Sequence, residues 1–217
     1  MDFKRMFAGI VFVAVAMTAA FTAQAQQAPA AGAPAQGAPA QGGGGRGPGR
    51  GPQGPPLTLT SPAFTDLQLL PAKYGCAGGN NISFPLAWAN APAATQSFAV
   101  VVSDIDLRQA RGHVAPSHWV LWNIPPTTTS LPEGIPAVPE LPDGSRQTIT
   151  AGRGGAPGTG FRAMCPPPPT VHHYAIELYA LDIKLDTLAT GASVTDLYAA
   201  IDGHVIGHQI MVVPFHQ

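Results

Sequence analysis

Side chains that could bind a charged ligand stand where three apolar runs of this chain begin or end. Asp104 and Asp106 follow the first run, His118 opens the second, and His172 and Tyr174 open the third. Imidazoles, a phenol and loop N–H groups can donate to a phosphate, whereas a carboxylate can accept from an ammonium group. A carboxylate beside an imidazole also fixes its tautomer and favours its cationic form. These residue types predict a site for a small anion or a zwitterionic headgroup.

The apolar runs that carry these residues are predicted to be β-strands. Residues 97–103 are dense in Phe and Val, residues 118–124 are rich in Trp, Val and Ile, and residues 174–181 alternate between two sets of side chains. Residues 57–60 alternate Leu and Thr, and we expect all four segments to be central strands of a sheet. Loops at strand ends are common places for a ligand site.

The remaining segments predict loops, one helix and a last strand. Pro and Gly recur too often between residues 125 and 170 for long regular elements. Ser193 is placed to cap a helix whose apolar spacing runs on to Val205, with Gly207 placed to end it. Residues 209–214 read as the final strand. The class is therefore mainly β with few helices, without the alternation of a βαβ architecture.

The N-terminus predicts a signal peptide over residues 1–25. Two basic residues precede an apolar stretch at 6–20, and Ala23-Gln24-Ala25 has the small-x-small form of a signal-peptidase site. A membrane anchor is the alternative, but the stretch is shorter than the roughly 20 residues that a spanning helix needs. Cleavage would give a periplasmic or secreted protein with no integral membrane segment.

The mature chain divides into a tether and one domain. Residues 26–56 are almost entirely Ala, Gly, Pro and Gln, which cannot form a core and predict a disordered tether. Residues 57–217 are of a comfortable size for one domain. This domain has seven Lys and Arg against eleven Asp and Glu, a formal charge of −4. That balance disfavours nucleic acid and anionic membrane surfaces as partners.

The two cysteines, Cys76 and Cys165, are predicted to form a disulfide. A secreted protein meets an oxidising compartment, where a bridge is favoured over two free thiols. A metal site is the weaker alternative, because no Cys-x-x-Cys or Cys-x-x-His motif is present. No metal and no cofactor are predicted.

The order of several short motifs resembles the phosphatidylethanolamine-binding protein family, in particular its bacterial Raf-kinase-inhibitor-like branch. They are Asn81-Ile-Ser-Phe-Pro-Leu-Ala-Trp88, Asp104-x-Asp106, His118-Trp-Val-Leu-Trp-Asn123, Cys165-Pro-Pro, His172-x-Tyr174 and Leu178-Tyr-Ala-Leu-Asp182. The resemblance implies a large central antiparallel sheet flanked by a smaller sheet and a C-terminal helix. It also implies a sheet-edge anion pocket built from Asp104, Asp106, His118, Pro166, Pro167, His172 and Tyr174, with the cysteines joining two of its loops.

The chain departs from the family pattern at positions that bear on this pocket. Ile105, Phe84 and the pair Ala163-Met164 replace family residues, and His173 replaces an arginine. A phospholipid headgroup therefore does not follow as the ligand. His173 is expected to face away from its neighbour on a strand. The other histidines, His113, His204, His208 and His216, are expected to be structural or at the surface.

Three functions fit these observations. The first is an extracytoplasmic protein that binds a small anionic or phosphorylated molecule. The second is a protein-directed inhibitor of a protease or kinase, a role described for relatives of the family. The third is a metal-dependent phosphoesterase, but the chain lacks His-Glu-x-x-His and Gly-x-Ser-x-Gly. We therefore expect a binding protein and not an enzyme.

Overall fold

The structure, a computed structural model, describes residues 54–78, 81–107, 115–148 and 159–217. The predicted signal peptide (1–25), nearly all of the predicted tether (26–56) and His113 lie outside these residues. In the part of the chain that is described, no helix has the length and apolar character needed to cross a membrane.

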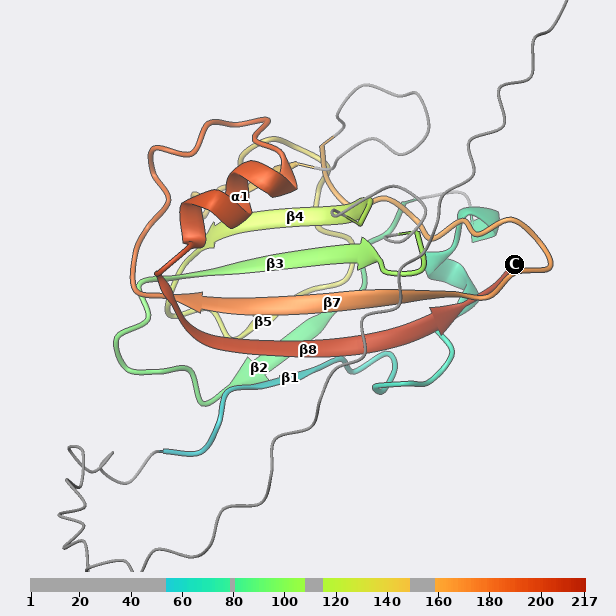
Figure 1. The fold of residues 1–217 in the computed structure, drawn as a ribbon, viewed down its shortest axis with the longest axis horizontal. Coiled ribbons are helices and arrows are strands. Elements are labelled where there is room, and N and C mark those ends of the chain that lie inside the picture. The colour runs from blue at the N-terminus through green and yellow to red at the C-terminus, as the bar shows by residue number, and fades with distance from the viewer. Residues whose placement is uncertain (1–53, 79–80, 108–114, 149–158) are drawn as a thin grey trace, which may run out of the picture. The chain divides into compact units, whose positions relative to one another are not determined.

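A large antiparallel sheet carries the residues that could bind a ligand (Figure 1). Its strand order is β6-β4-β3-β7-β8, so β3 is the central strand and β6 and β8 are the two edge strands. The predicted mainly β class with a central antiparallel sheet is confirmed. The strands are β3 (Ser97–Asp104), β4 (Ser117–Ile124), β6 (Arg146–Thr148), β7 (His172–Leu181) and β8 (Val205–Phe215).

A smaller antiparallel sheet of three short strands has the order β1-β2-β5. These strands are β1 (Thr58–Thr60), β2 (Leu86–Ala89) and β5 (Ser130–Leu131). The prediction that residues 57–60 form a central strand was wrong, because β1 is an edge strand of this smaller sheet. Alternation reports one buried face and does not say which sheet the strand joins. Strand β2 was not predicted from the sequence.

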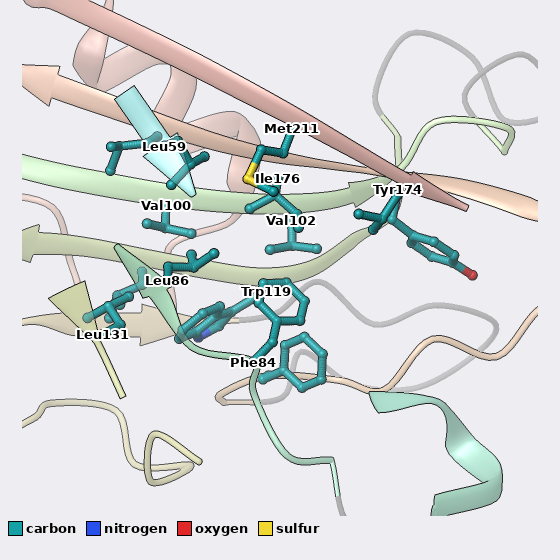
Figure 2. Packing of buried hydrophobic residues seen from close by; sticks show 14 of the residues in the cluster. Leu59, Phe84, Leu86, Val100, Val102, Trp119, Leu131, Tyr174, Ile176 and Met211 are labelled. Atoms are coloured by element: carbon teal, nitrogen blue, oxygen red, sulfur yellow. The ribbon is translucent and has the colours of Figure 1, made fainter. Parts of the chain in front are cut away.

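The large sheet has apolar residues on both faces, which makes three layers. On one face, Val100, Val102 and Trp119 pack with Leu86 and Leu131 of the smaller sheet (Figure 2). On the other face, helix α1 (Val194–Ile201) covers the sheet, and its buried side chains Val194, Leu197 and Ile201 join Ala99, Val101 and Trp122. Burial on both faces explains why β3 reads as a continuous apolar run.

Helix α1 begins where the sequence predicts and ends earlier. Ser193 Oγ accepts from the Asp196 N–H, and the Asp196 carboxylate accepts from the Ser193 N–H, which completes a capping box. The helix stops at Ile201, and Gly203 has φ 78°. The predicted extension to Gly207 was therefore wrong. Val205 has helical spacing from Ile201 but starts β8.

The cap gives a direct test of this local structure. We expect Ser193→Ala to lower the free energy of unfolding by about 1 kcal/mol, because the Asp196 N–H loses its acceptor. Ser193→Asp keeps an acceptor at the cap and serves as the matched control. Urea unfolding followed by circular dichroism measures both variants. Equal losses for Ala and Asp would contradict a role for the cap.

Candidate functional site

Antiparallel pairing brings three of the predicted site segments to one end of the large sheet. Asp104, at the end of β3, is the register partner of Tyr174 near the start of β7. Ser103 is the register partner of Ser117, which places His118 at the start of β4 beside the same end. Side chains that are far apart in the sequence therefore lie together at this end of the sheet.

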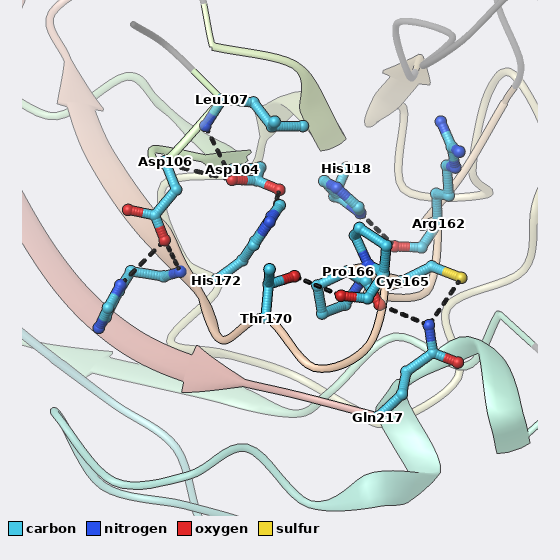
Figure 3. A network of polar contacts seen from close by, with 12 residues as sticks. Asp104, Asp106, Leu107, His118, Arg162, Cys165, Pro166, Thr170, His172 and Gln217 are labelled. Atoms are coloured by element: carbon cyan, nitrogen blue, oxygen red, sulfur yellow. Dashed lines mark hydrogen bonds and ion pairs between the residues drawn. The ribbon is translucent and has the colours of Figure 1, made fainter. Parts of the chain in front are cut away.

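Asp104 and His172 form a buried pair at this end (Figure 3). Asp104 Oδ2 lies 2.7 Å from His172 Nδ1, and only 3% and 12% of the two side chains are exposed. Asp104 Oδ1 accepts from the backbone N–H groups of Asp106 and Leu107, both at 3.2 Å. A carboxylate only accepts, so Nδ1 of His172 must donate, which leaves Nε2 outside this pair.

His118 is held in a similar way by a backbone carbonyl. Its Nδ1 lies 3.1 Å from the Arg162 carbonyl oxygen, and the Arg162 N–H donates to the His118 carbonyl at 2.8 Å. Burial lowers the pKa of His118, although its hydrogen bond to the Arg162 carbonyl opposes this shift. Only 7% of the residue is exposed. The ring is therefore neutral at neutral pH, with its proton on Nδ1.

The ring of Tyr174 packs against both imidazole rings, those of His118 and His172. Its ring centroid lies 5.1 Å from that of His118, edge to face, and 6.5 Å from that of His172. Burial, followed by the charge of Asp104, raises the pKa of Tyr174 well above its usual value, so the phenol keeps its proton. Figure 2 shows its hydroxyl pointing away from the apolar cluster. We call Asp104, His118, His172 and Tyr174 the Asp104 cluster.

Asp106 makes a separate and more exposed pair. Its Oδ2 accepts from the His173 N–H at 2.6 Å and from His173 Nδ1 at 2.9 Å. The two side chains are 42% and 48% exposed. Partial burial would raise the pKa of Asp106, but the hydrogen bonds from His173 outweigh it and lower the pKa. Adjacent strand residues point to opposite faces, so His172 serves Asp104 while His173 serves Asp106.

The loop of four prolines lies between Cys165 and Thr170 and is tied down at both ends. Thr170 donates to the Pro167 carbonyl through its N–H at 2.9 Å and also through its hydroxyl. The side-chain amide of Gln217, the last residue of the chain, donates to the Pro166 carbonyl at 2.6 Å (Figure 3). These hydrogen bonds fix the position of the loop, which leads into β7 at His172.

The predicted disulfide between Cys76 and Cys165 is confirmed, with a Cα–Cα distance of 5.3 Å. Cys76 opens the second of two short 3₁₀ helices, η1 (Ala72–Tyr74) and η2 (Cys76–Gly78). The Cys76 N–H donates to the Met164 carbonyl at 2.9 Å. Gly75 passes so close to the Phe215 ring that a Cβ there would lie 2.1 Å from it, so a side chain cannot replace the hydrogen. The bridge therefore joins η2 to the start of the proline loop.

Several partners at this site were not predicted from the sequence. They are the Arg162 carbonyl, the Gln217 side chain and the pairing of Asp106 with His173. No sequence signal marks one backbone carbonyl, or the side-chain amide of Gln217, as a partner at the site. The adjacent His172 and His173 opposite two aspartates could have suggested two pairs.

The remaining described histidines lie elsewhere. His204 contacts Asp182 at 2.9 Å, beside the end of β7 opposite to His172, and His208 contacts Glu177 at 3.3 Å. His216 contacts its neighbour Gln217. Over residues 54–78, 81–107, 115–148 and 159–217, no group of three or more His, Cys, Asp or Glu is arranged to hold a metal ion.

Sequence comparisons identify relatives over most of the domain. The family model described as "Phosphatidylethanolamine-binding protein" matches residues 60–216. A UPF0098 protein of Methanothermobacter thermautotrophicus is 41% identical over 160 residues, which cover 72% of this chain and 96% of that protein. The UPF0098 protein YbhB of Escherichia coli is 38% identical over 117 residues, which cover 53% of this chain and 69% of YbhB.

Solved structures share the fold. A crystal structure described as a phosphatidylethanolamine-binding protein homologue, CT736 of Chlamydia trachomatis, superposes with a TM-score of 0.62 at 30% identity, covering 75% of this chain and 98% of that one. Escherichia coli YbcL superposes with a TM-score of 0.59 at 24% identity, covering 74% of this chain and 98% of YbcL. The second likeness concerns the fold alone.

Proposed function

Since this chain belongs to the phosphatidylethanolamine-binding protein family, we propose that it binds a small anionic or phosphorylated molecule at the Asp104 cluster. The proline loop, including Pro166 and Pro167, would form one wall of this site. Asp106, which is more exposed than Asp104, would shape the neighbouring turn through its bonds to His173.

The observation that carries the proposal is the shared arrangement of the two imidazoles. His118 and His172 both contact Tyr174, and each has its Nδ1 bound by the protein. Packing and hydrogen bonds thus fix both rings before a ligand arrives. Fixed donors and acceptors bind small ligands well because little ordering entropy is lost on binding.

The compartment is part of the proposal. A disulfide joins the only two cysteines of the chain, and such bridges persist in oxidising compartments. This supports a periplasmic or secreted protein, as the N-terminal sequence predicts. A binding role also fits the absence of a three-ligand metal cluster from the described residues, but direct assays with added metal must test for hydrolysis.

We expect His118→Ala and His172→Ala each to weaken the binding of phosphoethanolamine and of inorganic phosphate. The loss should be about 1.5–3 kcal/mol, or roughly 10- to 150-fold in Kd, which is typical of a lost hydrogen bond to a charged group. Isothermal titration calorimetry of the purified protein measures both ligands with each variant.

His204→Ala is the control for these titrations. His204 also pairs with an aspartate, but it lies beside the far end of β7 and should leave affinity unchanged. His216 is a poorer control because it adjoins Gln217, which holds the proline loop. The proposal fails if the wild type binds neither ligand, or if His204→Ala loses as much affinity as the two cluster variants.

A further inference from the structure

Both imidazoles of the Asp104 cluster have one ring nitrogen committed to the protein. Nδ1 of His118 faces the Arg162 carbonyl, and Nδ1 of His172 faces the Asp104 carboxylate. Both partners can only accept, so the proton of each neutral ring sits on Nδ1. In the neutral form, each ring therefore offers a lone pair at Nε2 and no N–H. An anion that brings no proton would meet two acceptors.

His118 is the ring for which the neutral form is favoured. Burial is the main cause that lowers its pKa, and the charge of Arg162 lowers it further. The hydrogen bond to the Arg162 carbonyl and the charge of Asp104 on β3 act in the opposite direction without reversing the shift. From β7, Tyr174 packs against the His118 ring as a neutral phenol, and the His172 ring packs against Tyr174 in turn. Charging His118 would thus require a cation in a buried place.

We propose that the Asp104 cluster selects phosphate groups that carry a proton, with the P–O–H group donating to Nε2 of His118. This inference rests on the proposed function, because it requires the phosphate to reach both imidazoles. His172 supplies the complementary half. When its ring is protonated, Nδ1 stays bound to Asp104 and Nε2–H donates to an unprotonated phosphate oxygen. The ligand class is inorganic phosphate or a phosphate monoester in its monoanionic form.

Two related anions lack the proton that His118 would accept. Sulfate is fully ionised near neutral pH, and a phosphodiester carries no P–O–H group. Each would set an oxygen lone pair against the Nε2 lone pair, or would require the buried ring to become charged. An intact phosphatidylethanolamine headgroup is a diester, so the proposal favours free phosphate and monoesters over that lipid source.

Calorimetric titration with three probes at pH 6 tests the selectivity. The probes are sodium phosphate, sodium sulfate and glycerophosphoethanolamine, which is a diester that also carries an ammonium group. We expect phosphate to bind at least about tenfold more tightly than either of the others, the effect of one hydrogen bond to a charged group. The pH dependence is tested with phosphoethanolamine, a phosphate monoester whose second pKa is about 6. Raising the pH to 8 should weaken its binding because its phosphate group loses its remaining proton, whereas inorganic phosphate keeps one P–O–H group at both pH values.

A variant separates the acceptor role of His118 from its packing. His118→Gln replaces the fixed acceptor by an amide that can rotate to present either oxygen or NH₂, so the phosphate-to-sulfate affinity ratio should fall toward one. His204→Gln should leave this ratio unchanged. If His118→Gln does not fold, the three wild-type titrations decide alone.

The outcomes distinguish this inference from the proposed function. Equal wild-type affinities for phosphate and sulfate overturn the selectivity but leave an anion site standing. Tight binding of glycerophosphoethanolamine likewise overturns it, because the donor would then be the ammonium group. Binding of none of the three probes overturns both proposals.

Discussion

Replacing Asp104 by Ala is expected to lower the free energy of unfolding by about 2–4 kcal/mol. The buried carboxylate accepts from His172 Nδ1 and from the N–H groups of Asp106 and Leu107. In the variant, all three donors lose this acceptor at once. Removing one member of a buried pair is costly because the partner remains desolvated without compensation. The same change should also abolish measurable phosphate binding, because His172 loses the group that orients it.

The chain contains a matched control two residues away. Asp106→Ala removes the same type of side chain and breaks the same type of pair, but Asp106 and His173 are close to half exposed. Exposed pairs contribute only about 0–1 kcal/mol. Urea unfolding at pH 7 measures both variants, with calorimetry for phosphate affinity. Similar losses of stability for Asp104→Ala and Asp106→Ala would refute the distinct role of the buried pair.

Removing the disulfide should have an effect of similar size. The bridged residues are 89 positions apart, and closing a loop of that length stabilises the folded state by about 4–5 kcal/mol on the chain-entropy model. We expect the double variant Cys76→Ala, Cys165→Ala to lose up to this amount. Measured losses are often smaller when the unfolded chain retains structure, and about 2 kcal/mol is the lower expectation.

Reduction provides the control for this experiment. Unfolding of the wild type in dithiothreitol should match that of the double variant, and dithiothreitol should not affect the double variant. Denatured, unreduced wild type should react with a thiol reagent at neither cysteine. Modification of both would contradict the bridge. A bridge whose loss changes neither stability nor phosphate affinity would show that backbone bonds such as Cys76 N–H to the Met164 carbonyl hold the loop by themselves.

Local patterns in the sequence predicted two strands of the large sheet and the start of the helix. Residues 97–103 and 118–124 gave strands β3 and β4 because both faces of the sheet are buried and demand apolar side chains throughout. The start of α1 followed from Ser193 and Asp196, whose capping bonds join residues three apart. Its end did not follow, since the apolar Val205 has helical spacing by coincidence and is needed in β8 instead.

The sequence motifs, together with the family resemblance that they carry, also predicted that several of these side chains share one site. Asp104, His118, His172 and Tyr174 stand at strand ends, and antiparallel pairing places those ends at one edge of the sheet. The cysteine pair was predicted from the expected compartment and from the absence of metal-binding motifs. In these cases the signal lies in the side chains themselves, so that a reader of the sequence can see it.

Only the tertiary structure decided which partner each of these side chains has. It separated the buried Asp104–His172 pair from the exposed Asp106–His173 pair, although the residue types are the same. It also set the Arg162 carbonyl against His118, and the Gln217 amide against the Pro166 carbonyl. Every residue has a backbone carbonyl, so nothing in the sequence singles out the one that fixes a tautomer. Strand register and loop packing select it, and these depend on contacts between distant parts of the chain.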